Sequence, residues 1–223
     1  MDKLQNFNGF NKEGLTFLEK LSKNNNRDWF ESNKSLFKDV LEPDSKNFTL
    51  SLKASLEKLL NKPIKSKIFR IYRDVRFSKD KTPYNTHIRI AFYLEENPNG
   101  PALMLSLEPD QSLIMGCGIF EFSKSDIEIY RQNITTNTKK QNLDKILNDI
   151  KNNQYRVDMP SYKKIPKEYV DQYPQEELLK AKGLTVWKES NLPKEFFSKD
   201  AIEFSLTQYK QMLPLHSWLN FKQ

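Results

Sequence analysis

The residues best suited to chemistry lie in one stretch, Ile68–His87. Within it, five cations stand against two carboxylates among apolar residues, which leaves a local excess of three positive charges. Arginine is the natural partner of carboxylate and phosphate groups, because its planar fork binds them through two hydrogen bonds and stays charged at any relevant pH. The charged residues are Arg70, Arg73, Arg76, Lys79 and Lys81, with Asp74 and Asp80 opposite them.

Two interpretations account for this charge, since even one desolvated cation costs several kcal/mol unless it is paired. Acidic residues from elsewhere, such as Glu13, Asp28 or Glu31, complete an internal network, or an anionic ligand does. For any single arginine the internal pair is favoured. For the whole cluster we expect an anion pocket, because nearby acids would have to match every cation. Arg27, close to Trp29 near the start of the chain, is a further candidate for this pocket or for a pair with an acid.

Proton transfer has three candidates in the same stretch: His87, Asp74 and Tyr84. The chain contains only two histidines, and His87 lies nearer the cations than His216 does. A histidine titrates close to neutral pH and therefore suits acid–base work. The alternative for His87 is a strand histidine that bonds a backbone carbonyl.

Recognisable catalytic motifs are missing. We find no phosphate-binding glycine loop, no dinucleotide fingerprint, no His-Glu-x-x-His and no serine-hydrolase elbow. The single Cys117 cannot form a zinc-binding pair, and between Gly116 and Gly118 it is expected to be a small buried hydrophobe. The sequence therefore predicts no metal site and indicates no particular cofactor.

Composition limits the partners. The 223 residues carry a net charge of +7, but lysine is spread along the whole chain with Asp and Glu between, so we expect at most weak, non-specific binding to nucleic acid. No apolar run is long enough to span a membrane, and the start lacks a signal-peptide core. With one cysteine, we expect a cytoplasmic protein without a disulfide. The oligomeric state does not follow from the sequence.

Apolar spacing predicts helices at both ends of the chain. Helical periods occur over Asn11–Ser22, from the Asn24–Asn26 cap to about Leu41, and from there to Leu60, with Glu42-Pro43 expected as a break. After the sheet, Ser123 is expected to cap a helix, and others follow near Leu143–Ile150 and Ser198–Met212, the last ending before Pro214. Pro174–Ala181 and Leu184–Lys188 are expected as a short helix and a strand.

The middle of the chain predicts an antiparallel sheet. Ile68–Tyr72, His87–Leu94, Ala102–Leu107 and Ser112–Phe120 are rich in β-branched and aromatic residues, and the last three are joined by hairpin-length turns. We therefore expect a single α+β domain over 1–223. It has a helical part at 1–62, an antiparallel sheet of about four to five strands within 64–120, and a mainly helical part at 123–223 that packs on the sheet with the N-terminal helices.

The cationic stretch also resembles a known family. The run Arg73–Tyr84, with Thr86 and His87 after it, is similar to the signature of the bacterial family called domain of unknown function 2461. Asn24–Phe30, Leu178–Lys182 and the C-terminal Pro214–Leu219 agree with it, so the resemblance covers nearly the full length. It implies no activity, because the family has none established. Near Asp171–Pro174 the chain has Tyr173 where the family pattern suggests a histidine.

Three classes of function remain open. The first, which we expect, is a soluble domain that binds a phosphorylated or carboxylated small molecule, with His87, Asp74 or Tyr84 available for proton transfer. The second is a nucleic-acid binder whose basic loop contacts phosphates while Tyr72, Tyr84 or Tyr93 stack on bases. The third is a protein-interaction module whose arginines form a structural salt-bridge network.

Overall fold

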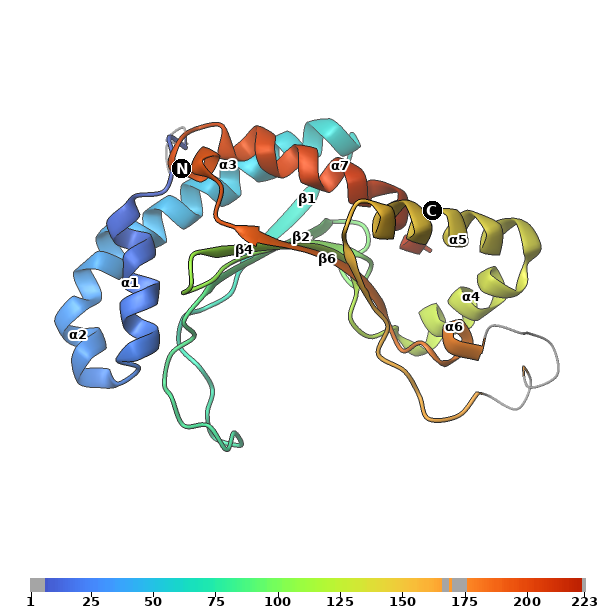
Figure 1. Ribbon diagram of the computed structural model, residues 1–223, viewed down its shortest axis with the longest axis horizontal. Coiled ribbons are helices and arrows are strands. Elements are labelled where there is room, and N and C mark those ends of the chain that lie inside the picture. The colour runs from blue at the N-terminus through green and yellow to red at the C-terminus, as the bar shows by residue number, and fades with distance from the viewer. Residues whose placement is uncertain (1–6, 166–168, 170–175, 222–223) are drawn as a thin grey trace. The chain divides into compact units, whose positions relative to one another are not determined.

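The computed structural model describes residues 7–165, 169 and 176–221 (Figure 1). The helices are α1 (Lys12–Lys23), α2 (Arg27–Ser35), α3 (Glu42–Leu60), α4 (Lys124–Thr135), α5 (Asn137–Asn152), α6 (Glu176–Lys180) and α7 (Ala201–Leu219), with a π-helical segment η1 (Leu36–Leu41) and a 3₁₀ turn η3 (Lys194–Phe197). The strands are β1 (Ile64–Ile68), β2 (Ile88–Leu94), β3 (Ala102–Leu107), β4 (Ser112–Ile119), β5 (Arg156–Asp158) and β6 (Leu184–Asn191).

The strands form one six-stranded antiparallel sheet in the order β1-β2-β3-β4-β6-β5. This confirms the α+β prediction of a central antiparallel sheet with helices before and after it. The C-terminal part supplies two strands, β6 and the short β5, which pair with Val157 opposite Val186. The sequence had indicated β6 as far as Lys188 but not β5.

The first strand lies earlier than predicted. The strand expected at Ile68–Tyr72 ends at Ile68, and after the Phe69 N–H bonds the carbonyl of Arg89 the chain leaves the sheet. The apolar residues that suggested a strand pack elsewhere. Ile71 is buried beyond the end of β1, and Tyr72 forms only an isolated bridge to Tyr84.

Neither proline expected to interrupt a helix does so. Before Pro43, the helix widens into η1, where the Glu42 N–H bonds the Phe37 carbonyl, and Pro43 then occupies the first turn of α3. A proline is tolerated in a first turn because its missing N–H is not needed there. Helix α7 continues through Pro214 to Leu219, because fully buried Met212 and Leu215 on either side hold it in the core.

Side-chain caps mark the starts of three helices, whereas α5 begins at Asn137, six residues before the expected Leu143. Asn11 caps α1, Asn26 caps α2 by accepting from the Trp29 N–H, and Ser123 caps α4 by accepting from the Asp126 N–H. A side-chain oxygen at this position satisfies one of the amide groups that a helix start leaves unpaired. None of the helices within the described ranges has the length and apolar character that a membrane span requires.

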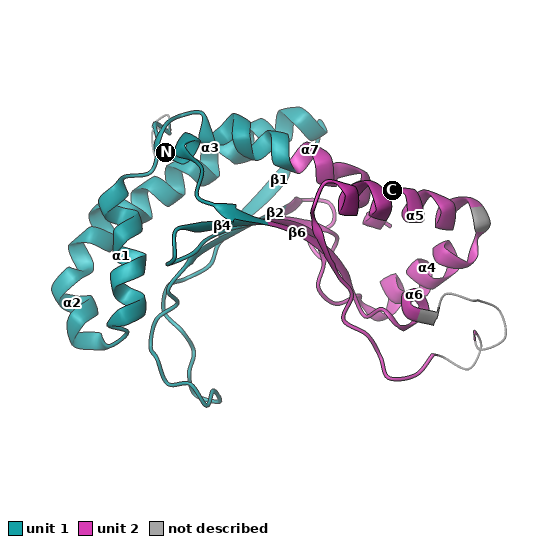
Figure 2. Cartoon of the chain, in the orientation of Figure 1, with its two compact units in different colours: residues 1–92, 104–114, 189–208 teal, residues 93–103, 115–188, 209–223 magenta. Residues whose placement is uncertain are grey.

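The chain divides into two compact units, each assembled from three segments (Figure 2). Unit 1 contains Met1–Phe92, Met104–Ile114 and Glu189–Gln208, and unit 2 contains Tyr93–Leu103, Met115–Lys188 and Tyr209–Gln223. The core of unit 1 contains a cluster of aromatic residues, which include Phe10, Phe17, Phe30, Phe48 and Phe196.

Cys117 lies in the core of unit 2. Its side chain is fully buried, as expected, and burial raises the pKa of its thiol. A thiol that resists ionisation is a poor nucleophile, because the thiolate is the reactive form. Cys117 therefore has a packing role.

Candidate functional site

The cationic stretch forms a long excursion between β1 and β2, residues 69–87, which we call the arm (Figure 1). Its two sides are joined near its base by backbone hydrogen bonds. The Arg73 N–H donates to the Pro83 carbonyl at 2.9 Å, and the Asn85 N–H donates to the Ile71 carbonyl at 2.6 Å. Residues 74–82 therefore form the tip. The arm belongs entirely to unit 1.

An asparagine from the turn between α1 and α2 anchors the arm. Asn25 donates from Nδ2 to the Tyr84 carbonyl at 2.9 Å, and its Oδ1 accepts from the Tyr84 N–H at 3.1 Å. The Tyr84 ring stacks on Phe30 of α2, with ring centroids 4.0 Å apart and planes 11° from parallel. The polar clamp and the aromatic stack together fix the returning side of the arm against α2.

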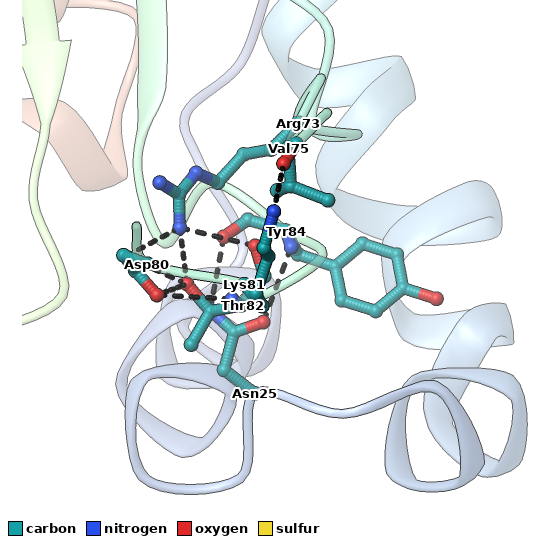
Figure 3. A network of polar contacts seen from close by, with 7 residues as sticks. All are labelled: Asn25, Arg73, Val75, Asp80, Lys81, Thr82 and Tyr84. Atoms are coloured by element: carbon teal, nitrogen blue, oxygen red, sulfur yellow. Dashed lines mark hydrogen bonds and ion pairs between the residues drawn. The ribbon is translucent and has the colours of Figure 1, made fainter. Parts of the chain in front are cut away.

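Arg73 is held by a network inside the arm (Figure 3). Its NH1 nitrogen donates to Asp80 at 2.6 Å, to the Thr82 carbonyl at 3.0 Å and to the Thr82 hydroxyl. Asp80 also accepts from the Thr82 N–H at 2.9 Å. The hydrogen bond from the Thr82 N–H has the largest effect on Asp80, and together these bonds lower its pKa to about 2. Asp80 is therefore a carboxylate at any physiological pH. All three of these Arg73 bonds use the same guanidinium nitrogen (Figure 3).

Two other cations of the arm also bond within it. Arg76 forms a two-pronged pair with Asp74, at 2.9 and 2.7 Å, and this pair lowers the pKa of the carboxyl. Lys81 donates to the carbonyls of Val75 and Arg76, at 2.9 and 3.4 Å. The Arg76 side chain is nevertheless 77% exposed, so its pair with Asp74 is solvated.

His87 lies where the arm rejoins the sheet, and it meets a carboxylate from the next strand. Its Nδ1 is 3.9 Å from Oε2 of Glu108, and the two side chains are 18% and 17% exposed. The other Glu108 oxygen accepts from the Ser106 hydroxyl at 2.5 Å. Burial lowers the pKa of His87, and the charges of Arg89 and Arg73 lower it further, while Glu108 opposes them. The imidazole is therefore mainly neutral at pH 7.

The sequence-derived candidates thus fall into separate places. Arg73 is close enough to His87 for its charge to act on the imidazole, whereas the bonds of Arg76 and Lys81 stay within the arm. Arg27, at the start of α2, acts on the hydroxyl of Tyr84, whose pKa is raised chiefly by burial. Arg70 and Lys79 are exposed along the arm, and the charge of Arg70 acts on Asp74.

Glu108 and Arg89 are not among the candidate residues that the sequence indicates. Glu108 follows the last residue of β3, and His87 precedes the first residue of β2. Since neighbouring antiparallel strands place the start of one opposite the end of the next, the hairpin brings the two together. The signal was present in the expected strands, because Glu108 is the first charged residue after the strand that ends at Leu107.

No group of three or more metal-binding side chains comes together in the parts of the chain that the structure describes. The expected departure at Asp171–Pro174 lies outside those parts. Oxygen and nitrogen ligands of the arm are instead used for hydrogen bonds and ion pairs, as described above. The described part of the arm therefore offers cationic side chains and one imidazole as its chemically useful groups.

These features define an α+β domain with a hydrogen-bonded cationic arm beside a histidine–glutamate pair. The family described as conserved hypothetical protein (DUF2461) matches residues 13–218, and the chain belongs to it. The resemblance seen in the cationic stretch is therefore confirmed over nearly the full length. No curated protein matches the chain.

Proposed function

We propose that this protein binds the phosphate or carboxylate group of a small molecule beside His87. The observation that carries the proposal is the mostly buried imidazole of His87, whose pKa is lowered by burial and then by the charges of Arg89 and Arg73, with a Glu108 oxygen 3.9 Å from its Nδ1. Two positive charges around a neutral ring suit an anion, which would be attracted by both. The anion would also relieve the unfavourable effect of these charges on the protonated imidazole.

The two arginines have hydrogen-bond donors to spare. Arg73 uses NH1 for its network with Asp80 and Thr82, so its other guanidinium nitrogens take no part in that network. Arg89 is exposed on β2, and no carboxylate pairs with it within residues 7–165, 169 and 176–221. A guanidinium fork of this kind matches the geometry of phosphate and carboxylate oxygens. The proposal therefore places the anion near Arg73 and Arg89, away from Arg76, whose fork is occupied by Asp74.

His87 is the best of the three proton-transfer candidates. Its lowered pKa keeps it neutral and able to accept a proton at pH 7. Glu108 at 3.9 Å would stabilise the protonated form, as a carboxylate does beside a working histidine. Asp74, by contrast, is paired with Arg76, and the pKa of Tyr84 is raised away from neutrality. A reaction at this site would consequently use His87 as its base.

Thermal melting in phosphate tests the proposal. Inorganic phosphate should raise Tm beyond the effect of chloride at equal ionic strength, with about 2.7 kcal/mol of stabilisation at a hundred times the dissociation constant. Arg89→Ala should remove this increment. Arg76→Ala, which deletes an arginine fork already satisfied by Asp74, is the matched control and should keep it. Equal loss in both variants, or no phosphate-specific increment in the unsubstituted protein, would show that the site beside His87 does not bind anions.

A second candidate is the interaction module whose arginines hold the fold. The pairs Arg73–Asp80 and Arg76–Asp74 favour it, because both arginines find their partners inside the arm. In that case Arg73→Ala should disorder the arm, and phosphate should protect no variant. Hydrogen exchange of the arm amides, measured with and without phosphate, separates the two functions.

A further inference from the structure

The tip of the arm presents a phenylalanine to solvent. Phe77 is 97% exposed, the highest value among the large apolar residues that the structure describes as exposed. Burying an aromatic ring is strongly favourable, so a partner that covered Phe77 would gain binding free energy from it. The guanidinium carbon of Arg76 lies 5.9 Å from the centre of the ring. The tip therefore combines an open aromatic face with a cation beside it.

Internal bonds hold this tip in one conformation. The Ser78 N–H donates to the Val75 carbonyl at 3.3 Å, and the Lys81 ammonium donates to the same carbonyl at 2.9 Å. The Arg73–Asp80 pair closes the loop below them at 2.6 Å. A pre-ordered loop loses less conformational entropy when it binds a partner than a flexible one does. The exposed ring is thus presented by a built scaffold.

Other exposed aromatic residues follow the same arm, interleaved with cations. Phe69 is 45% exposed with the Lys67 ammonium 4.8 Å from its ring centre, and Tyr72 is 42% exposed. Arg70 lies between them in sequence, and Lys79 follows Phe77. The arm itself has five cations and two carboxylates, an excess of three, within a chain of net charge +7.

We propose that the arm is a site for single-stranded nucleic acid, in which Phe77 stacks on a base while Arg70 and Lys79 contact phosphates. Aromatic residues and cations alternate along the arm, and a single strand matches this pattern, because each nucleotide carries an exposed base face and one negative charge. Binding is weak and independent of base sequence, since aromatic stacking accepts any base. This agrees with the diffuse basic character of the whole chain.

A single strand fits the arm better than a bilayer does. Backbone pairing at Tyr72–Tyr84 and Arg73–Pro83 sets the tip apart from the base, so Phe77 is at the far end while Phe69 and Tyr72 are near the sheet. A membrane surface would reach the tip and engage one ring. A strand that runs along the arm can engage several rings and their neighbouring cations.

Fluorescence anisotropy with labelled oligothymidylate of about 12 nucleotides, a length typical of such sites, tests the proposal. The unsubstituted protein should bind at micromolar concentrations in low salt. Phe77→Ala should weaken binding about tenfold, the loss expected for one stacked base. Phe120→Ala is the matched control, because it removes a 63% exposed phenylalanine outside the arm and should change nothing. Both variants keep the net charge.

A strand of the same length without bases separates stacking from charge. Phe77→Ala should not affect binding of this strand. Lys79→Ala should weaken binding of both strands and make the slope of log affinity against log salt concentration shallower by about 0.7. The proposal is overturned if Phe77→Ala and Phe120→Ala behave alike, if no oligonucleotide binds, or if anionic phosphatidylglycerol vesicles bind through Phe77 while the oligonucleotide does not. Phe77→Ala should leave the phosphate-specific rise in Tm intact, so the oligonucleotide site and the anion site beside His87 can fail independently.

Discussion

The clamp formed by Asn25 gives a sharp test of how the arm is held. Asn25→Ala removes both side-chain hydrogen bonds to the backbone of Tyr84, at 2.9 and 3.1 Å. Each is expected to contribute about 1 kcal/mol, so opening of the arm base should become about 2 kcal/mol easier. Tyr84 is only 4% exposed, so water does not readily replace the lost partners while the arm stays closed.

Amide hydrogen exchange measures this opening directly. A change of about 2 kcal/mol corresponds to roughly thirtyfold faster exchange at Tyr84 if the amide exchanges through local opening. Asn24→Ala is the matched control, because that side chain donates to the Lys20 carbonyl in α1 and not to the arm, and the Tyr84 amide should keep its protection. Equal exchange rates at Tyr84 in the two variants would refute the clamp.

Three other changes probe the fold and the arm. Gly118→Ala should destabilise the protein by about 2–5 kcal/mol in denaturant unfolding, because φ is +135° and a Cβ would lie 2.1 Å from the Leu184 carbonyl oxygen; an unchanged midpoint would contradict this. Phe30→Ala should cost about 3–5 kcal/mol, since the ring is fully buried and stacks on the arm, and a loss below 1 kcal/mol would show that the stack is not structural. The pKa of Asp80 is about 2 in the fold against an ordinary 3.8, so its stabilising effect is complete above pH 3.8 and is lost as pH falls toward 2. Asp80→Asn should reduce the loss of stability between pH 3.8 and pH 2. If the variant loses as much stability over this range as the unsubstituted protein, the Arg73–Asp80 network is not the cause of that loss.

The sequence was sufficient for elements whose pattern is local. The caps at Asn26 and Ser123 and the hairpins within 88–119 depend on neighbouring residues, and they were predicted within a few positions. The first strand was misplaced because β1, Ile-Lys-Ser-Lys-Ile, has only two apolar residues and is an edge strand whose position is set by β2. The predicted helix end before Pro214 was wrong for a related reason, because packing against distant residues rather than local propensity keeps α7 helical.

In the candidate site, too, the local features could be predicted from the sequence and the contacts between distant residues could not. The excess of cations was visible in the sequence, and so were Asp74 and Asp80 as possible partners. What the sequence did not reveal was which arginine each aspartate would take, because that depends on the folded path of the arm. The approach of Glu108 to His87 required the pairing of β2 with β3, which joins residues 21 positions apart.

The pKa of His87 measured by NMR, with and without phosphate, tests the central proposal most directly. Without phosphate, burial and the two arginines should keep this pKa below its ordinary value of 6.5. A phosphate bound beside the ring should raise it by on the order of one unit, because the anion favours the protonated imidazole. His216, buried in α7, is the internal reference and should not respond. A His87 pKa that is the same in phosphate and in chloride of equal ionic strength would contradict an anion site beside His87.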